Sequence, residues 1–302
     1  MKKLFRTASL LFITTIGLIT CGEDNSNSSD NIIDGLATAS TEIAGSEVYS
    51  AIISTLESIE AISILSEVDH INSASTVEMT LPYTHVVLFG NPSLGTPLMQ
   101  ENILTGLDLP QKILVTENLD GSTDISFNDP SYLKGRYKLV NDTLLAKIRT
   151  ALTNIVGSSD GKVTLKTTSK ISKHEGIIST TSNNAFEETY TAIKTAISNN
   201  DKLKVTAELN HKMNAASVNM ELANSKLIIF GNPDLGSPLM IKNQKLGLEL
   251  PQKMLIYERN GQVMISYNDP AFLLNRFNIE GESEIASKIS DALASIAAAG
   301  SN

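Results

Sequence analysis

The sequence predicts an α+β protein in which two similar two-layer α/β sandwich domains follow one another along the chain. Two observations predict this fold: a long internal repeat, and alternating strand and helix periodicities within each copy. The string FGNPSLGTPLM, from Phe89 to Met99, returns as FGNPDLGSPLM, from Phe230 to Met240. This period of 141 residues is far longer than the roughly 20 to 50 residues of a solenoid unit, so it indicates two complete domains.

The repeat extends well beyond that string. LDLPQK, which begins at Leu107, returns as LELPQK at Leu248, and SFNDP, which begins at Ser126, returns as SYNDP at Ser266. The second offset is one residue shorter because the turn NLDG is matched by RNG, and turns tolerate such length changes. Matched single residues are Tyr49 with Tyr190, His70 with His211, Glu117 with Glu258, and Arg136 with Arg276.

The first half of each copy predicts a strand, a helix and a second strand. In the second copy, the strand is expected over Gly176–Ser182, and Phe186 begins an apolar stripe with helical spacing that ends at Ile197. Lys202–His211 then alternates apolar and polar residues, as a half-buried strand does, and a short helix around Ala215 follows.

The second half of each copy predicts three strands and two helices. Lys226–Phe230 is a solidly apolar strand, which indicates cover on both faces or a domain contact. Asn260 and the glycine after it suit the type I′ turn of a hairpin. Asp269 and Pro270 are typical of a helix start, as are Asp129 and its proline in the first copy. The last helices are expected at Ser283–Ala298 and, in the first copy, Asp142–Val156.

The order within each copy is therefore β-α-β-(α)-β-β-β-α-α, which predicts an α+β two-layer sandwich. The expected segments are a signal peptide (1–20), a lipidated cysteine with a polar tether (21–34), a first domain (35–156), a linker or extended edge strand (157–175) and a second domain (176–299).

The first 20 residues predict a bacterial lipoprotein signal. Lys2, Lys3 and Arg6 precede an apolar run, and the sequence LITC ends at Cys21, where signal peptidase would cut. The alternative is an uncleaved membrane anchor, but the apolar run is well short of the roughly 20 residues that a spanning helix needs. Cys21 is the only cysteine, so we expect it to carry lipid on the cell envelope, facing the periplasm or in the outer membrane.

Charge and motif content exclude several partners. Without the three basic residues of the signal, 21 basic groups face 33 acidic ones, a net charge of −12, which disfavours nucleic acid. No HExxH, CxxC or EF-hand loop is present, so we expect no metal site. The glycine-rich string lacks the P-loop ending and the three-glycine dinucleotide spacing, so we expect no cofactor.

The repeated motifs resemble those of the bacterial and archaeal domain of unknown function 302 family, here in two copies. The resemblance is carried by VDHINSA and LNHKMNA, the FGNPxxGxPLM string, LDLPQK, and SxNDPxxL, which together cover about 230 of the 302 residues. It implies a small α+β domain and no assigned reaction. Glu249 stands where the family pattern has Asp, and Asn210 stands where it has an Asp before the histidine.

The glycine-rich string contains most of the ligand-binding candidates. Such a turn before a short helix can present backbone N–H groups to an anion, or its glycines can supply positive φ angles while Leu98 and Met99 fill the core. The binding candidates are Gly90, Asn91, Gly95, Thr96 and Arg136 in the first copy, and Gly231, Asn232, Gly236, Ser237 and Arg276 in the second.

The matched histidines and glutamates are the catalytic candidates. His70 and His211 end matched strands, where an imidazole acts either as an acid/base group or as a structural hydrogen-bonding group. Glu117 and Glu258 are either bases with raised pKa values or ion-pair partners of the matched arginines, and we favour the ion pair.

Three classes of function remain. The first is a non-catalytic module that binds a small ligand, the second an enzyme with an acid/base pair drawn from His, Glu and the Asp of the NDP motif in each repeat, and the third a structural envelope protein. We favour the first. We also expect the two repeats to pack as an intramolecular pseudo-dimer, with any pocket between the two glycine-rich strings and the matched His and Glu residues.

Overall fold

The computed structural model describes residues 33–159, 162–164 and 169–301. The chain divides into a unit of Met1–Asn31 and a compact unit of Ile32–Asn302. The compact unit contains both repeats, and the description below concerns this unit alone. Cys21, the expected signal and most of the expected tether lie outside the described residues.

The first repeat forms an antiparallel sheet with the strand order β2-β3-β4-β5-β1-β6. Its strands are β1 (Leu36–Thr41), β2 (Ser63–Asp69), β3 (Thr84–Gly90), β4 (Gln111–Glu117), β5 (Thr123–Asn128) and β6 (Lys162–Thr164). Its helices are α1 (Gly45–Glu57), α2 (His70–Ser75), α3 (Pro92–Glu101), the 3₁₀ helix η1 (Ile103–Leu107), α4 (Pro130–Tyr137) and α5 (Asp142–Gly157).

The second repeat forms an antiparallel sheet with the matching order β7-β11-β10-β9-β8. Its strands are β7 (Ile177–Ser182), β8 (Lys204–Asn210), β9 (Ser225–Gly231), β10 (Gln252–Arg259) and β11 (Gln262–Asn268). Its helices are α6 (Phe186–Ser198), α7 (His211–Ser217), α8 (Pro233–Lys242), the 3₁₀ helix η2 (Gln244–Leu248), α9 (Pro270–Arg276) and α10 (Ser283–Ser301). The predicted α+β fold, with two similar sheet-and-helix repeats in tandem, is confirmed.

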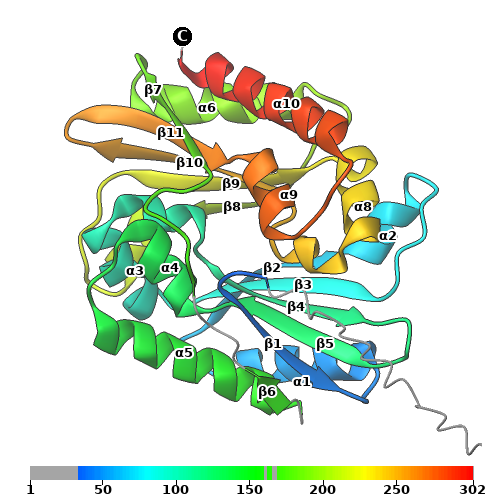
Figure 1. The fold of residues 1–302 in the computed structure, drawn as a ribbon. Helices are drawn as coiled ribbons and strands as arrows, with labels where there is room; N and C mark the ends of the chain where they lie inside the picture. Colours follow the sequence, from blue (N-terminus) through cyan, green and yellow to red (C-terminus); the bar gives the residue numbers. More distant parts are fainter. Residues whose placement is uncertain (1–32, 160–161, 165–168, 302) are drawn as a thin grey trace, which may run out of the picture. The chain divides into compact units, whose positions relative to one another are not determined.

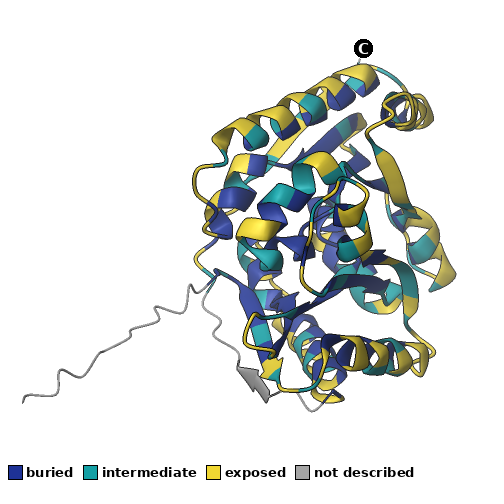
Figure 2. Cartoon of the chain, turned by 90° about the vertical axis from the view of Figure 1, so that its right-hand side faces the viewer, coloured by how far each residue is buried: buried dark blue, intermediate teal, exposed yellow. Residues whose placement is uncertain are grey.

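The two sheets face each other within the compact unit. Figure 1 shows α1 and α5 on the outer side of the first sheet and α6 and α10 on the outer side of the second. Figure 2 shows buried residues along the strands and exposed residues on the outer sides of the helices. One hydrophobic core joins both repeats. β9 lies inside its sheet, and Leu227 to Phe230 are buried, in agreement with the solidly apolar sequence.

Local signals predicted most elements well. The hairpin turn has positive φ at Asn260 (55°) and Gly261 (76°). Asp129 and Asp269 cap α4 and α9, each accepting a hydrogen bond from the backbone N–H two residues later. In the segment expected to be linker or edge strand, β6 pairs with β1.

The glycine-rich strings are the main correction. They form the first turns of α3 and α8 rather than open turns, and an additional 3₁₀ helix follows each of them. Gly95 lies inside α3, and no glycine of either string has a positive φ, so the expected reason for these glycines was wrong. The expectation that Leu98 and Met99 fill the core is confirmed, because both side chains are buried.

Candidate functional site

A cavity of about 350 Å³ lies beside the glycine-rich string of the first repeat. Its walls include Asn91, Gly95 and Thr96 of the string, apolar residues of β2 and α5, and Gln111 at the start of β4. The second repeat contributes His211 together with neighbouring residues of β8 and α7. The cavity is therefore built from both repeats.

A second cavity, of about 200 Å³, occupies the matching position in the second repeat. Its walls include Asn232, Gly236 and Ser237 of the second string and Gln252 at the start of β10. The first repeat contributes His70 with neighbouring residues of β2 and α2. Gly90 and Gly231 line their respective cavities as well, so every candidate of the two glycine-rich strings borders a cavity.

The matched histidines hold the two repeats together at the cavity walls. His70 Nε2 lies 3.1 Å from the carbonyl oxygen of Gly247, and His211 Nε2 lies 3.1 Å from that of Gly106. Since a carbonyl only accepts, each imidazole donates its Nε2–H to the other repeat. Burial lowers the pKa of both histidines to about 4, although the hydrogen bond to the backbone carbonyl raises it. Both rings are therefore neutral at pH 7.

These shifts predict an acid-sensitive fold. A histidine whose pKa drops from 6.5 to about 4 on folding keeps its stabilising effect above pH 6.5 and loses it as the pH falls toward 4. From pH 6.5 to 5, urea unfolding should show the free energy of unfolding falling by roughly 1 kcal/mol per pH unit for each histidine. His211→Gln keeps an N–H donor for Gly106 and should halve the summed slope that the two histidines produce. A slope unchanged by the substitution would contradict the assignment.

Three buried polar atoms at the cavities have no hydrogen-bond partner among the described residues. They are Gln111 Nε2 in the first cavity, and Ser237 Oγ and Gln252 Oε1 in the second. Ser237 is fully buried and Gln252 is 8% exposed. A buried polar atom without a partner costs about 1–3 kcal/mol, so each atom has an unused capacity to bind a polar group.

The matched glutamates lie elsewhere and have local partners. Glu117 Oε1 accepts from the backbone N–H of Gly45 at 2.7 Å, at the start of α1. Glu258 Oε2 accepts from Asn224 Nδ2 at 2.9 Å. Neither lines the two cavities, and no hydrogen bond or ion pair in the described part of the chain joins them to the matched histidines.

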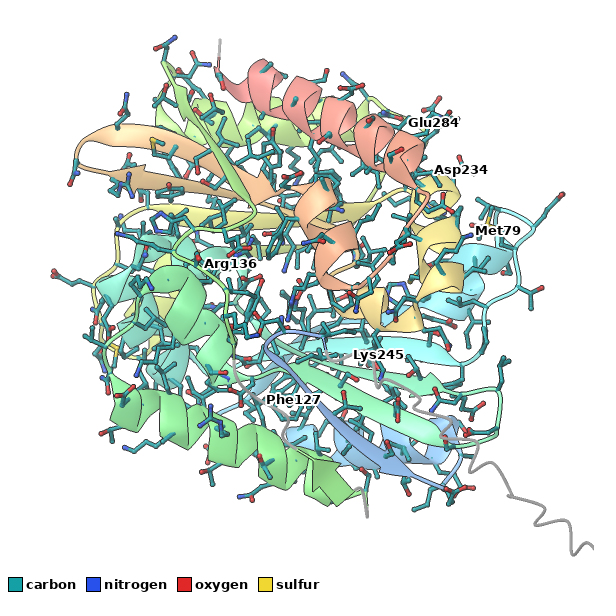
Figure 3. All side chains as sticks on the ribbon, in the orientation of Figure 1. Met79, Phe127, Arg136, Asp234, Lys245 and Glu284 are labelled. Carbon is teal, nitrogen blue, oxygen red and sulfur yellow. The ribbon has the colours of Figure 1, made fainter. Side chains whose placement is uncertain are left out.

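The expected ion pairs between these glutamates and Arg136 or Arg276 were wrong. Arg136 NH1 pairs with Asp108 Oδ2 at 2.7 Å, and Arg276 NH1 pairs with Glu249 Oε1 at 3.2 Å. Both arginines are buried and neither lines a cavity. Figure 3 shows Arg136 in the region between the two sheets. The structure therefore places both arginines in a charge cluster between the repeats.

This central charge cluster is formed by matched residues of both repeats. Lys112 Nζ donates to Glu249 Oε2 at 2.7 Å, and Lys253 Nζ donates to Asp108 Oδ1 at 3.1 Å. Arg136 NH2 donates to Asn268 Oδ1 at 2.9 Å, and Arg276 NH2 donates to Asn128 Oδ1 at 2.7 Å. The cluster comprises Asp108, Lys112, Asn128 and Arg136 of the first repeat and Glu249, Lys253, Asn268 and Arg276 of the second.

The charges of this cluster do not balance when every group is ionised, because four cations face two carboxylates. Burial raises the pKa of the Glu249 carboxyl, but the surrounding cations lower it more and hold it well below its usual range. Burial lowers the pKa of Lys112 to about 7, against the attraction of Glu249. Burial thus favours the neutral form of Lys112, in the direction that reduces the excess positive charge.

This cluster was not predicted from the sequence, although a signal for it existed. The motifs LDLPQK and LELPQK repeat an acidic residue and a lysine four positions apart, next to apolar strands. Charged residues are almost never fully buried unless they are paired, so this pattern by itself does not indicate a buried cluster. The partner of Lys112 lies 137 residues away in the other repeat, which no local pattern reveals.

Two further observations concern metal ligands and membrane-spanning helices. They contain no group of three or more His, Cys, Asp or Glu side chains placed to hold a metal ion. None of the described helices combines the length and apolar character needed to cross a membrane.

The comparisons with known proteins identify both repeats. The model of the family described as "Domain of unknown function DUF302" matches residues 37–155 and 178–299. A solved structure, an uncharacterised conserved DUF302 protein from Bacillus stearothermophilus, is similar with a TM-score of 0.39 and 18% sequence identity. The similarity covers 41% of this chain and 98% of that one.

Two curated relatives share one stretch of sequence with this chain. They are "Fluoride-specific ion channel FluC 1" of Brucella suis biovar 1 (strain 1330) and "Fluoride-specific ion channel FluC 2" of Brucella melitensis biotype 1 (strain ATCC 23456 / CCUG 17765 / NCTC 10094 / 16M). Each is 34% identical over 110 residues, which is 36% of this chain. The match spans 43% of the first relative and 40% of the second, so this chain covers about two fifths of their length.

Proposed function

This chain belongs to the family described as domain of unknown function DUF302, whose model matches it in two regions, and we propose from the geometry of its cavities that it is a non-catalytic binding module. Each of the two cavities between the repeats takes a small, largely apolar ligand that carries one polar group. The walls support this proposal, since Phe89, Leu152 and Ile155 in the first cavity and Phe230 and Leu293 in the second are apolar.

The observation that carries the proposal is the pair of unpartnered atoms in the second cavity. Ser237 Oγ and Gln252 Oε1 are buried beside apolar walls with no hydrogen-bond partner in the described residues. The matched Gln111 carries an unpartnered Nε2 in the first cavity. A ligand hydroxyl or amide satisfies these atoms and gains the free energy that the unliganded protein lacks.

The arrangement of titratable groups favours binding over acid/base catalysis. His70 and His211 are neutral donors to carbonyl groups, and their pKa values of about 4 make them poor bases near pH 7. Glu117 and Glu258 each hold a local partner outside the cavities. The enzyme alternative requires such groups to converge on one substrate.

A neutral dye tests the proposal. The fluorescence of N-phenyl-1-naphthylamine rises in apolar surroundings, and we expect saturable binding at two sites per chain. Ala151 and Ala292 occupy matched positions in the walls of the first and second cavity. Ala151→Phe and Ala292→Phe should each remove one site, and the double variant should remove both.

Each single variant is the control for the other, because each leaves one cavity open. A double variant that binds the dye like the wild type would contradict the proposal. Absence of saturable binding to the wild type would instead favour the structural envelope protein.

We also propose that the chain is anchored to a bacterial envelope membrane through lipid on Cys21, facing the periplasm or in the outer membrane. The support is the order of a basic segment, an apolar run and LITC. Cys21→Ala should shift the protein from the membrane fraction to the soluble fraction. Cys21→Ser preserves the size of the side chain but also removes the thiol, so it should have the same effect. Tight membrane association of both variants would contradict lipid anchoring.

A further inference from the structure

The two cavities differ at their mouths, although their interiors match. The lining of the first cavity contains no Asp, Glu, Lys or Arg among the described residues. The second cavity is lined by Lys202 and Lys204, which are both exposed and therefore lie at the mouth. The first repeat has Ala61 and Ser63 at the matching positions. The duplication has thus produced one uncharged cavity and one with two lysines.

The sheet fixes how far the backbone of Lys204 lies from that of Gln252, which carries one of the buried polar atoms. Lys204 pairs with Gly231 on one side of β9, and Gln252 pairs with Phe230 on the other. Strands lie about 4.8 Å apart, so the backbones of Lys204 and Gln252 are separated by roughly 10 Å across the end of β9. The walls around this end are apolar, which leaves room for a carbon skeleton between the lysine mouth and the polar interior.

One acidic side chain moderates the charge at this mouth. Asp234 Oδ2 lies 3.9 Å from Lys202 Nζ, a weak exposed pair, and Lys202 is 72% exposed. Lys204 has no ion-pair partner in the described part of the chain. The mouth therefore keeps a net positive charge beside an apolar cavity.

From this difference we propose that the second cavity selects anionic amphiphiles, whereas the first takes uncharged ones. This inference rests on the proposed binding function. The anionic head lies at Lys202 and Lys204, and the aliphatic chain lies against the apolar walls that lead to Ser237 and Gln252. A carboxylate and a phosphate monoester share the required chemistry, because both are compact anions on one end of an aliphatic chain.

The experiment compares octanoate with octan-1-ol as competitors of N-phenyl-1-naphthylamine. Ala151→Phe leaves only the second cavity open, and Ala292→Phe leaves only the first. The ratio of octanoate affinity to octan-1-ol affinity should be about tenfold higher in the second cavity than in the first. The preference should weaken as salt is added, because the lysines are exposed. Octyl phosphate, tested in parallel, distinguishes a phosphate head from a carboxylate head.

The first repeat supplies the matched substitutions. In the Ala151→Phe background, Lys202→Ala with Lys204→Ser should lower octanoate affinity about tenfold and leave octan-1-ol affinity unchanged. In the Ala292→Phe background, Ala61→Lys with Ser63→Lys should raise octanoate affinity. All four positions are exposed, so the variants should fold. Equal affinity ratios in both cavities, with dye and octan-1-ol bound normally, would overturn this inference alone. Failure of the dye to bind at all would overturn the proposed function beneath it.

Discussion

Glu249→Ala should lower the free energy of unfolding by about 3–5 kcal/mol, the usual cost of breaking a buried ion pair from one side. Glu249 is 1% exposed and accepts from Lys112, Lys253 and Arg276 at 2.7, 3.1 and 3.2 Å. Its removal leaves these buried cations with Asp108 as the remaining carboxylate of the cluster. Urea unfolding followed by circular dichroism at pH 7 measures the change.

The first repeat provides the control for this substitution. Asp108 occupies the position that matches Glu249, so Glu249→Asp keeps the charge and should cost clearly less than the alanine variant. Glu258→Ala removes a carboxylate that accepts a hydrogen bond from Asn224 at a partly exposed position, and it should cost about 1 kcal/mol. If Glu249→Ala is no more destabilising than Glu258→Ala, the central charge cluster does not hold the repeats together.

Gly176→Ala should cost about 2–5 kcal/mol, for a steric reason. Gly176 has φ of 63°, and a Cβ there would lie 2.0 Å from Cγ of Phe272. A left-handed residue costs about 1–2 kcal/mol, and an overpacked core costs about 1–3 kcal/mol more. Thermal unfolding should show the loss as a lower melting temperature.

Gly261→Ala separates the two contributions to this cost. Gly261 also has a positive φ, 76°, but no atom lies within 4 Å of the position of its missing Cβ. This variant should therefore lose only the 1–2 kcal/mol of the backbone strain. Equal losses in both variants would contradict the clash with Phe272.

The sequence predicted those parts of the fold that depend on local chemistry. The hairpin at Asn260 and the helix start at Asp269 were correct because turn type and capping follow from neighbouring residues. α3 was expected as a turn because Gly95 and Pro97 are helix breakers in isolation. In the folded protein Pro92 occupies the first turn of this helix and Asn91 caps it.

The candidate site was predictable only in part. The glycine-rich strings border the cavities, as do both matched histidines. Each histidine, however, faces the cavity of the other repeat, and that exchange depends on packing between segments more than 100 residues apart. The burial of Lys112 and Lys253 has the same origin, since their carboxylate partners include residues of the opposite repeat.

The central claim is that both cavities bind ligand against a histidine from the opposite repeat. The chain has four histidines, so a carbon–proton correlation spectrum of protein labelled at histidine resolves each ring. Added N-phenyl-1-naphthylamine should shift the signals of His70 and His211, while those of His85 and His174, which line neither cavity, stay in place. Ala151→Phe should abolish the shift of His211 and Ala292→Phe that of His70. Saturable dye binding that leaves the signals of both His70 and His211 unchanged would contradict the claim.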